Sequence, residues 1–206
     1  MTSAPMFAGA GTMRHLCRDK DWSQTALGPA DAWPAGLRTT VELVLGCSFP
    51  MSLLWGPELI QIYNDGYIPI LGAKHPWGLG LATRECWPEA WAFNEPIYRR
   101  VFAGETVSFE DQLYQLLRHG PDQQPDDVYI TLSYSPVRDE SGEIGGVLVT
   151  LIETTARVTT RRLEAEREEM YRALELERGR LGFVFQQSPT FLAVLHGPEY
   201  VVGFAN

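Results

Sequence analysis

The sequence has few cysteines and no long apolar run. Its three cysteines, Cys17, Cys47 and Cys86, are odd in number and form no CxxC pair. This pattern argues against a disulfide framework and a metal site, and it favours a reducing, cytoplasmic setting with buried thiols. No apolar stretch approaches the ~20 residues that a membrane helix needs, and the N-terminus lacks the basic and apolar regions of a secretory signal. We therefore expect no membrane contact by this part of the chain.

Excess positive charge and enzyme motifs are also missing. The net charge of −9 argues against a nucleic-acid-binding surface, which would need clustered lysine and arginine. The sequence contains no GxGxxG, P-loop, HExxH or GxSxG motif. None of the four histidines has the helical, acid-flanked setting of a kinase phosphoacceptor (His15, His75, His119 and His196). We expect no catalysis by this chain.

A highly charged stretch, residues 154–181, is the feature around which the chain is organised. Seven arginines and six glutamates lie among the 24 residues from Arg157 to Arg180, without a proline. Glu168 and Arg172 stand in the favoured i,i+4 order, which supports a long helix. Within it, Leu163 and Met170 repeat at seven residues, and Leu174 and Leu181 form a second seam of the same heptad.

Two alternatives remain for this helix. It is either a solvated single helix or one strand of a parallel two-helix coiled coil, and we favour the coiled coil because an apolar stripe cannot bury itself alone. Glu177 and Arg167 interrupt the two seams. The pairing is therefore expected to be weak and adjustable.

An internal repeat flanks the helix. Gly-Pro-Glu occurs at residues 56–58 and 197–199, each time between two short apolar runs that are followed by an asparagine. We expect four parts: a flexible segment and helical cap (1–48), a core domain (49–154), a coiled-coil helix (155–182) and the start of a second, truncated domain (183–206). The chain is interpreted as a fragment of a longer protein.

The core domain is predicted to be α+β. Residues 49–55 and 59–63 suit a hairpin, short helices follow, and residues 107–117, 128–137 and 144–152 suit three longer strands. Asp31 is expected to cap the helix that precedes the hairpin, and Pro96 to open a helix after one that Pro88 breaks. A five-stranded antiparallel sheet with helices on one face can close around a small cavity.

Three stretches resemble the PAS domain family. They are Tyr63-Asn-Asp-Gly-Tyr67, the strand from Tyr129 to Asp139, and the strand from Gly145 to Arg157. In that family the last strand typically ends in Asp-Ile-Thr; here Glu153, Thr154 and Thr155 keep the acid and the final threonine. The segment Asp21-Trp-Ser…Leu-Gly-Pro…Ala-Trp-Pro…Leu-Arg is similar to a subgroup at the head of bacterial PAS-containing histidine kinases, often hybrid ones.

The resemblance implies a PAS fold with a long C-terminal signalling helix, and a sensory or dimerisation role in a two-component phosphorelay. Glu153, Thr154, Thr155 and Arg157 would transmit a conformational signal from the sheet to the helix, and so to a downstream kinase. The expected partners are a second copy of the chain and the effector domain of the same protein. The second copy would be joined through the helix, with the N-terminal cap as a further candidate contact. A ligand-free relay module and an input domain for a diguanylate cyclase or phosphatase remain as alternatives.

A ligand would be expected to meet aromatic and polar side chains around the cavity. The alternative, which we favour, is that the aromatic ones simply fill it. Haem ligation by His75 is not favoured, because its Gly/Pro-rich loop is expected to be exposed. Cys86 precedes Trp87-Pro88 rather than a flavin-binding motif, so no cofactor is expected. The pocket candidates are Tyr63, Asn64, Tyr67, Trp77, Arg84, Trp87, Phe102, Tyr134 and Thr150.

Overall fold

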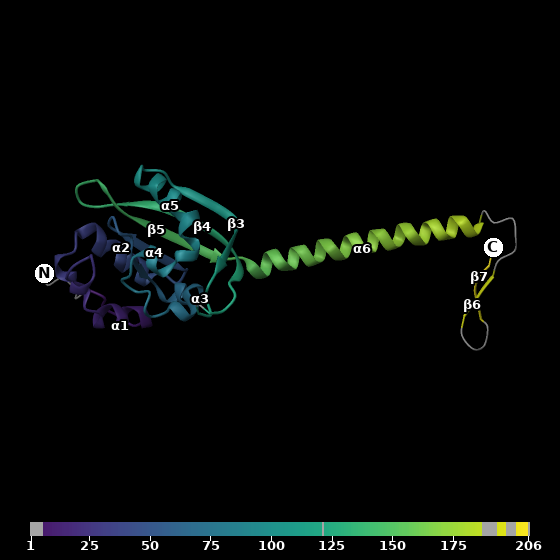
Figure 1. Cartoon of the computed structure of the whole chain (residues 1–206), viewed down its shortest axis with the longest axis horizontal. Helices are drawn as coiled ribbons and strands as arrows, with labels where there is room; N and C mark the ends of the chain where they lie inside the picture. Colours follow the sequence, from purple (N-terminus) through teal and green to yellow (C-terminus); the bar gives the residue numbers. More distant parts are fainter. Residues whose placement is uncertain (1–5, 121, 187–192, 197–200, 206) are drawn as a thin grey trace. The chain divides into compact units, whose positions relative to one another are not determined.

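A computed structural model describes residues 6–120, 122–186, 193–196 and 201–205. These residues divide into two compact units, the first ending at Thr155 and the second beginning at Ala156. The order of their elements can be followed in Figure 1.

The N-terminal segment belongs to the first unit. It forms α1 (Thr12–Asp19), the 3-10 turns η1 (Trp22–Gln24) and η2 (Ala30–Ala32), and α2 (Ala35–Gly46). The rings of Phe7, Trp22 and Trp33 pack together with centroids 4.9–6.3 Å apart. The Asp65 carboxylate accepts a 2.7 Å hydrogen bond from the Met13 amide, which lies in the first turn of α1. The cap is therefore joined to the core by both apolar packing and a helix-terminal hydrogen bond.

The prediction that Asp31 is the N-cap residue of α2 is wrong. Asp31 lies inside η2, and α2 begins at Ala35 after Pro34, which has an extended backbone and no side-chain cap bond. The backbone of a residue before a proline is biased away from helical geometry. Trp33 precedes Pro34, so α2 does not extend toward the N-terminus beyond Pro34. The helix start is set by the proline instead of the aspartate.

Five antiparallel strands form the sheet, as predicted. They are β1 (Met51–Trp55), β2 (Ile60–Tyr63), β3 (Val107–Leu116), β4 (Asp126–Arg138) and β5 (Ile144–Glu153), in the order β2-β1-β5-β4-β3. The first strand thus lies beside the last, with Leu53 opposite Leu148. Strand β5 therefore lies between β1 and β4, and its last three residues, from which the chain leaves the unit, pair with β4.

The two faces of the sheet are covered differently. Helical elements lie over the inner face: η3 (Asp65–Tyr67), α3 (Ile68–Leu71), η4 (Gly72–Lys74), α4 (Thr83–Cys86) and α5 (Pro88–Phe102). On the outer face, Leu53 and Ile62 are fully buried where α2 packs over β1 and β2. At the outer-face groove that Phe49 and Ile152 line, both side chains are more than half exposed. The cap therefore covers only one end of the outer face.

The helix start expected at Pro96 is also wrong, whereas the break expected at Pro88 is confirmed, because α4 ends at Cys86 and α5 begins at Pro88. Pro88 is the first residue of α5, where its missing N–H costs nothing, while Pro96 lies inside the same helix. An interior proline removes the hydrogen bond to the carbonyl four residues earlier, here Ala92. Because Ala92 and Pro96 are both exposed, water can satisfy that carbonyl and the helix continues.

The second unit contains α6 (Thr155–Gln186), β6 (Ala193–His196) and β7 (Val201–Ala205). The predicted helix is present and reaches five residues past Leu181. Strands β6 and β7 pair antiparallel, as expected for the repeated hairpin, whose Gly-Pro-Glu turn lies outside the described residues. Within the described part of the chain, no helix is long and apolar enough to cross a bilayer. The four-part division remains a prediction.

Candidate functional site

A small cavity lies between the inner face of the sheet and the helices. Its volume is about 40 Å³. Drug-sized ligands occupy pockets of roughly 300–1,000 Å³, whereas a single water needs about 10–15 Å³ on this measure. The space therefore fits a few water molecules. Among the side chains that line it are Ser52, Gln61, Tyr67, Trp87, Asn94, Tyr98, Tyr114 and Tyr134.

A hydrogen-bonded cluster lies at the α5 side of this cavity. The Oδ1 atom of Asn94 accepts from the Tyr134 hydroxyl at 2.9 Å and from the Tyr114 hydroxyl at 3.1 Å, and the two hydroxyls are 2.9 Å apart. Burial raises the pKa of Tyr114 to about 12 and the pKa of Tyr134 well above its usual value. The two tyrosines are therefore neutral, and each hydroxyl has a hydrogen-bond partner within the cluster.

A second polar cluster joins β2 to the start of α5. Gln61 accepts a 2.9 Å hydrogen bond from the Trp87 indole, and the ammonium of Lys74 lies 3.9 Å from the centre of a Trp87 ring. Lys74 also forms an ion pair with Glu89, whose Oε1 atom accepts from the Leu117 amide at 3.1 Å. These contacts tie η4, α5 and the end of β3 together, and they place a cation–π contact beside the cavity wall.

His75 lies near β2 but does not line the cavity. Its Nδ1 atom is 3.0 Å from the hydroxyl of the fully buried Tyr63. The ring is half-buried, which differs from the exposed loop position expected from its neighbours. Burial lowers the pKa of His75, with the Asp65 charge acting in the opposite direction. A neutral imidazole is therefore favoured in the folded chain.

Of the nine pocket candidates, three line the cavity: Tyr67, Trp87 and Tyr134. The side chain of Asn64 instead bonds four backbone groups. Trp77 is half exposed, the Arg84 guanidinium lies 5.9 Å from the centre of a Trp91 ring, Phe102 borders a surface groove, and Thr150 borders a groove on the outer face of the sheet.

Sequence reasoning missed Asn94 and Tyr114, the two partners of Tyr134. The alternation of β3 carried a signal for Tyr114, because it shares a face with the buried Leu116. The sequence pattern carried no signal for Asn94, because the helix was expected to begin only at Pro96 and Asn94 was placed before it. Among the described residues, no group of three or more His, Cys, Asp or Glu side chains is placed to bind a metal.

The junction between β5 and α6 is held by side chains from three strands. Glu153 forms a 2.8 Å ion pair with Arg118, which also contacts Asp126 at 3.2 Å. Thr154 donates its hydroxyl hydrogen to Asp111 at 2.6 Å, and its amide bonds the Tyr129 carbonyl at 2.7 Å.

The Thr155 hydroxyl completes this junction. It accepts from the Tyr129 amide at 3.0 Å and donates to the Glu153 carboxylate at 3.0 Å. Three of the four residues predicted to transmit a signal are thus bonded to β3, to β4 or to Arg118, which lies two residues after β3. The fourth, Arg157, lies in the exposed first turn of α6.

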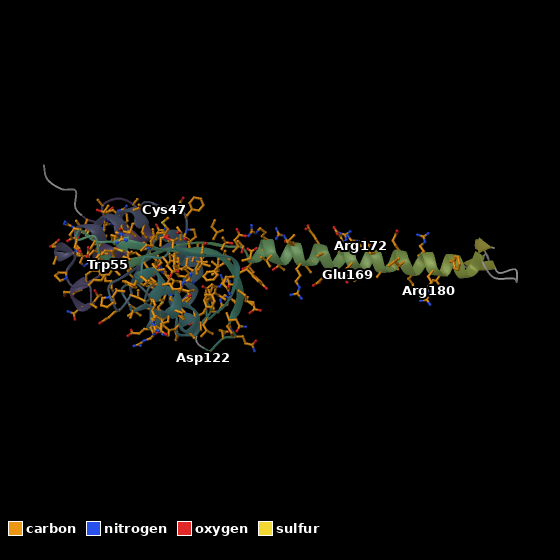
Figure 2. The ribbon with its side chains drawn as sticks, turned by 90° about the horizontal axis from the view of Figure 1, so that it is seen from above. Cys47, Trp55, Asp122, Glu169, Arg172 and Arg180 are labelled. Carbon is orange, nitrogen blue, oxygen red and sulfur yellow. The ribbon has the colours of Figure 1, made fainter. Side chains whose placement is uncertain are left out.

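Helix α6 presents unpartnered apolar side chains. Leu163, Met170, Leu174 and Leu181 are 54–73% exposed. The predicted Glu168–Arg172 pair is present at 3.4 Å. Figure 2 shows the side chains of Glu169, Arg172 and Arg180 projecting outward from the helix. The helix therefore combines a charged surface with two short apolar seams.

Residues 63–159 match the family model described as the PAS fold. The sheet order and the helices over its inner face agree with that match, so the first unit has the PAS fold. No curated protein matches the sequence.

Among solved structures, the phage VqmA–DPO complex is 19% identical over 66% of this chain and 60% of that one, with a TM-score of 0.45. An RNA-binding light-oxygen-voltage receptor is 19% identical over 71% and 42%, with a TM-score of 0.44. The PAS domain of Bordetella pertussis BvgS is 20% identical over 65% and 97%, with a TM-score of 0.47. The chain thus spans less than two thirds of the first two proteins.

Proposed function

We propose that this chain is the cytoplasmic PAS module of a bacterial signal-transduction protein. It passes a conformational signal through α6 to a downstream histidine kinase and has no catalytic activity of its own. One observation carries the proposal: the last strand of the sheet continues into a 32-residue helix with an exposed apolar seam. The similarity of residues 21–38 to the head of PAS-containing histidine kinases supports the choice of effector.

The junction explains how a signal would pass. Glu153, Thr154 and Thr155 are bonded to groups on or next to β3 and β4, so a displacement of these strands changes the position of the first turn of α6. Packed elements of this kind switch between discrete arrangements and do not deform continuously. Arg167 and Glu177 weaken the seams, which lets two helix pairings have similar free energies.

A second candidate is a relay module whose PAS core binds no ligand. The small cavity favours it, because the Tyr114 and Tyr134 hydroxyls already have a partner in Asn94. In this case the signal arrives from a neighbouring domain. An output through a diguanylate cyclase or phosphatase would use the same helix.

Two leucines on α6 provide a matched test of the coiled coil. Leu174 lies on a seam and is 63% exposed, whereas Leu176 is 76% exposed and lies about 200° farther around the helix. Burying a leucine side chain contributes about 1.5–3 kcal/mol. Two copies of Leu174→Ala should therefore weaken the dimer by at least tenfold, and Leu176→Ala should leave it unchanged. Sedimentation equilibrium measures both.

The outcome of that test is decisive for the helix. Equal weakening by both substitutions, or no weakening by Leu174→Ala, would show that the predicted seam does not join the subunits. A wild-type chain that stays monomeric at tens of micromolar would also contradict the proposal for this length of chain.

Ligand and effector need separate measurements. Native mass spectrometry with an absorption spectrum of the purified chain separates a sensor that retains a small molecule from a bare relay module. For the effector, α6 is joined in register to the catalytic region of a histidine kinase. Deleting two residues from α6 shifts the heptad register between the PAS core and the kinase region, and it should change the autophosphorylation rate. Deleting seven residues keeps the register and should restore the rate. Equal activity in both deletions would contradict transmission through the helix.

A further inference from the structure

Strand β3 carries a bulge in its middle. The pairing of β3 with β4 shifts register between Phe109 and Gln112, and Asp111 within the bulge has a φ of +48°. A non-glycine residue in this left-handed region is uncommon, although aspartate tolerates it better than most residues. Such bulges redirect a side chain out of the regular alternation of a strand. Here the redirected side chain is the Asp111 carboxylate.

The Asp111 carboxylate holds the residue before α6. Its Oδ1 atom accepts from the hydroxyls of Thr154 at 2.6 Å and Thr131 at 3.4 Å. The Asp111 amide donates to the Thr131 hydroxyl at 3.1 Å, which fixes the bulge against β4. Thr154 is 8% exposed and directly precedes the first helical residue. A carboxylate at this end of the helix also complements the helix dipole.

The same strand reaches the cavity three residues later. Tyr114 contributes its hydroxyl to the cluster with Asn94 and Tyr134 on the inner face of the sheet. Asp111 and its partner Thr131 face the outer side, because Ile130 and Leu132 on either side of Thr131 line the cavity. Strand β3 therefore links the inner cluster to the start of the helix within four residues.

We propose that Asp111 is a positioning residue for the first turn of α6, and that the β3 bulge couples this turn to the Tyr114–Asn94–Tyr134 cluster. The proposal rests on the proposed function, since it names the route by which the PAS core biases the helix. A change in the cluster, whether from a ligand or from a neighbouring domain, shifts Tyr114, and β3 carries that shift to Asp111. The helix start then gains or loses its anchor at Thr154.

Native-state hydrogen exchange tests the anchor. Amides 159–162 bond to the carbonyls of the first helical turn, so their exchange reports fraying of that turn. Thr154→Val removes the hydroxyl at nearly constant shape, while Thr154→Ser keeps it. Because hydrogen bonds to charged groups are stronger than neutral ones, we expect Thr154→Val to speed exchange at these amides on the order of tenfold or more. Thr154→Ser should stay within about threefold of wild type.

The aspartate is tested in the same way. Asp111→Gly removes the carboxylate and relieves the positive φ, so it should keep the bulge but speed exchange as Thr154→Val does. All variants are measured both alone and with Leu174→Ala. A failure of dimerisation is thereby separated from a failure of the anchor. Unchanged exchange at residues 159–162 in both Thr154→Val and Asp111→Gly would overturn the anchor.

The coupling is tested with a double-mutant cycle. Tyr114→Phe removes one hydroxyl from the inner cluster and should speed exchange at residues 159–162 severalfold. Tyr63→Phe removes a buried hydroxyl from β2, far from β3 in the sheet order, and should not. In the Thr154→Val background, Tyr114→Phe should add little. Equal effects of Tyr63→Phe and Tyr114→Phe, or full additivity with Thr154→Val, would overturn the route through β3.

Discussion

Asn64 offers a sharp test of whether a buried polar residue serves the fold or a ligand. It is 1% exposed, and its Oδ1 atom accepts from the amides of Met51 at 3.0 Å and Tyr67 at 3.1 Å. Its amide nitrogen donates to the carbonyls of Cys47 at 2.8 Å and Phe49 at 2.6 Å. One side chain thus joins the end of α2, the start of β1 and η3.

Asn64→Ala removes all four bonds at once. A net contribution of about 1 kcal/mol for each bond gives a loss of about 4 kcal/mol in the free energy of unfolding, within a range of about 3–5 kcal/mol. This is a large fraction of the 5–15 kcal/mol typical of a domain. For a unit of this size it corresponds to a fall in Tm of roughly 8–15 °C.

Urea denaturation followed by tryptophan fluorescence measures the loss. An m-value equal to that of wild type would support the two-state assumption. Gln24→Ala, at an exposed amide in η1, is the matched control and should stay within about 0.5 kcal/mol of wild type. Asn64→Asp keeps the acceptor but turns a second oxygen toward two carbonyls, so it should be no more stable than Asn64→Ala at neutral pH. A loss below about 1 kcal/mol for Asn64→Ala would refute a structural role and favour a ligand contact.

Three further predictions use thermal or urea denaturation or thiol chemistry. Gly72 has a φ of +55°, and a Cβ there would lie 2.2 Å from the Arg118 carbonyl, so Gly72→Ala should cost about 2 kcal/mol or more; Gly28→Ala, with a similar φ and open space, should cost less. The pKa of His75 is lowered in the folded chain, so on acidification the unfolded chain takes up a proton at His75 at a higher pH than the folded chain does. The free energy of unfolding therefore falls as the pH drops through about 6.5. Wild type should therefore lose more stability than His75→Gln between about pH 7.5 and pH 5; an equal loss would contradict this sign. Burial raises the pKa of Cys17 to about 12 and of Cys86 to about 11, so in a titration with a disulfide reagent only Cys47 should react fast. Cys47→Ser should remove that fast phase, and a surviving fast phase would show that a buried thiol is accessible.

Local patterns in the sequence predicted most of the elements. The alternation in residues 128–137 and the apolar run in 144–152 correspond to β4 and β5, since side chains on a strand alternate between faces and only one face of β4 is fully buried. The charge and heptad pattern predicted α6, because a helix places residues three and four apart on one surface. Helix starts were less predictable. For α2, the backbone restriction before Pro34 decided the boundary and not Asp31. For α5, the helix continues through Pro96 because Ala92 is exposed and water can satisfy its carbonyl, and exposure depends on the fold.

The candidate site was predicted less well than the fold. Tyr67, Trp87 and Tyr134 were identified because large aromatic side chains near a sheet tend to be buried, but burial alone does not say which cavity or neighbour they meet. Asn64 and Thr150 were expected in the same pocket, yet one bonds the backbone and the other borders the outer face of the sheet. Nothing local distinguishes these positions.

By itself, the sequence determined the order of helices and strands, the charged helix with its interrupted seams, and the repeated hairpin, because each depends on residues close together in the chain. Only the tertiary structure decided the size of the cavity, the neutral cluster around Asn94, and the bond from Asp111 to Thr154. Those features join residues 20 to 43 positions apart. Strand pairing and a single bulge in β3 bring them together, and their free energy depends on burial that only the folded chain supplies.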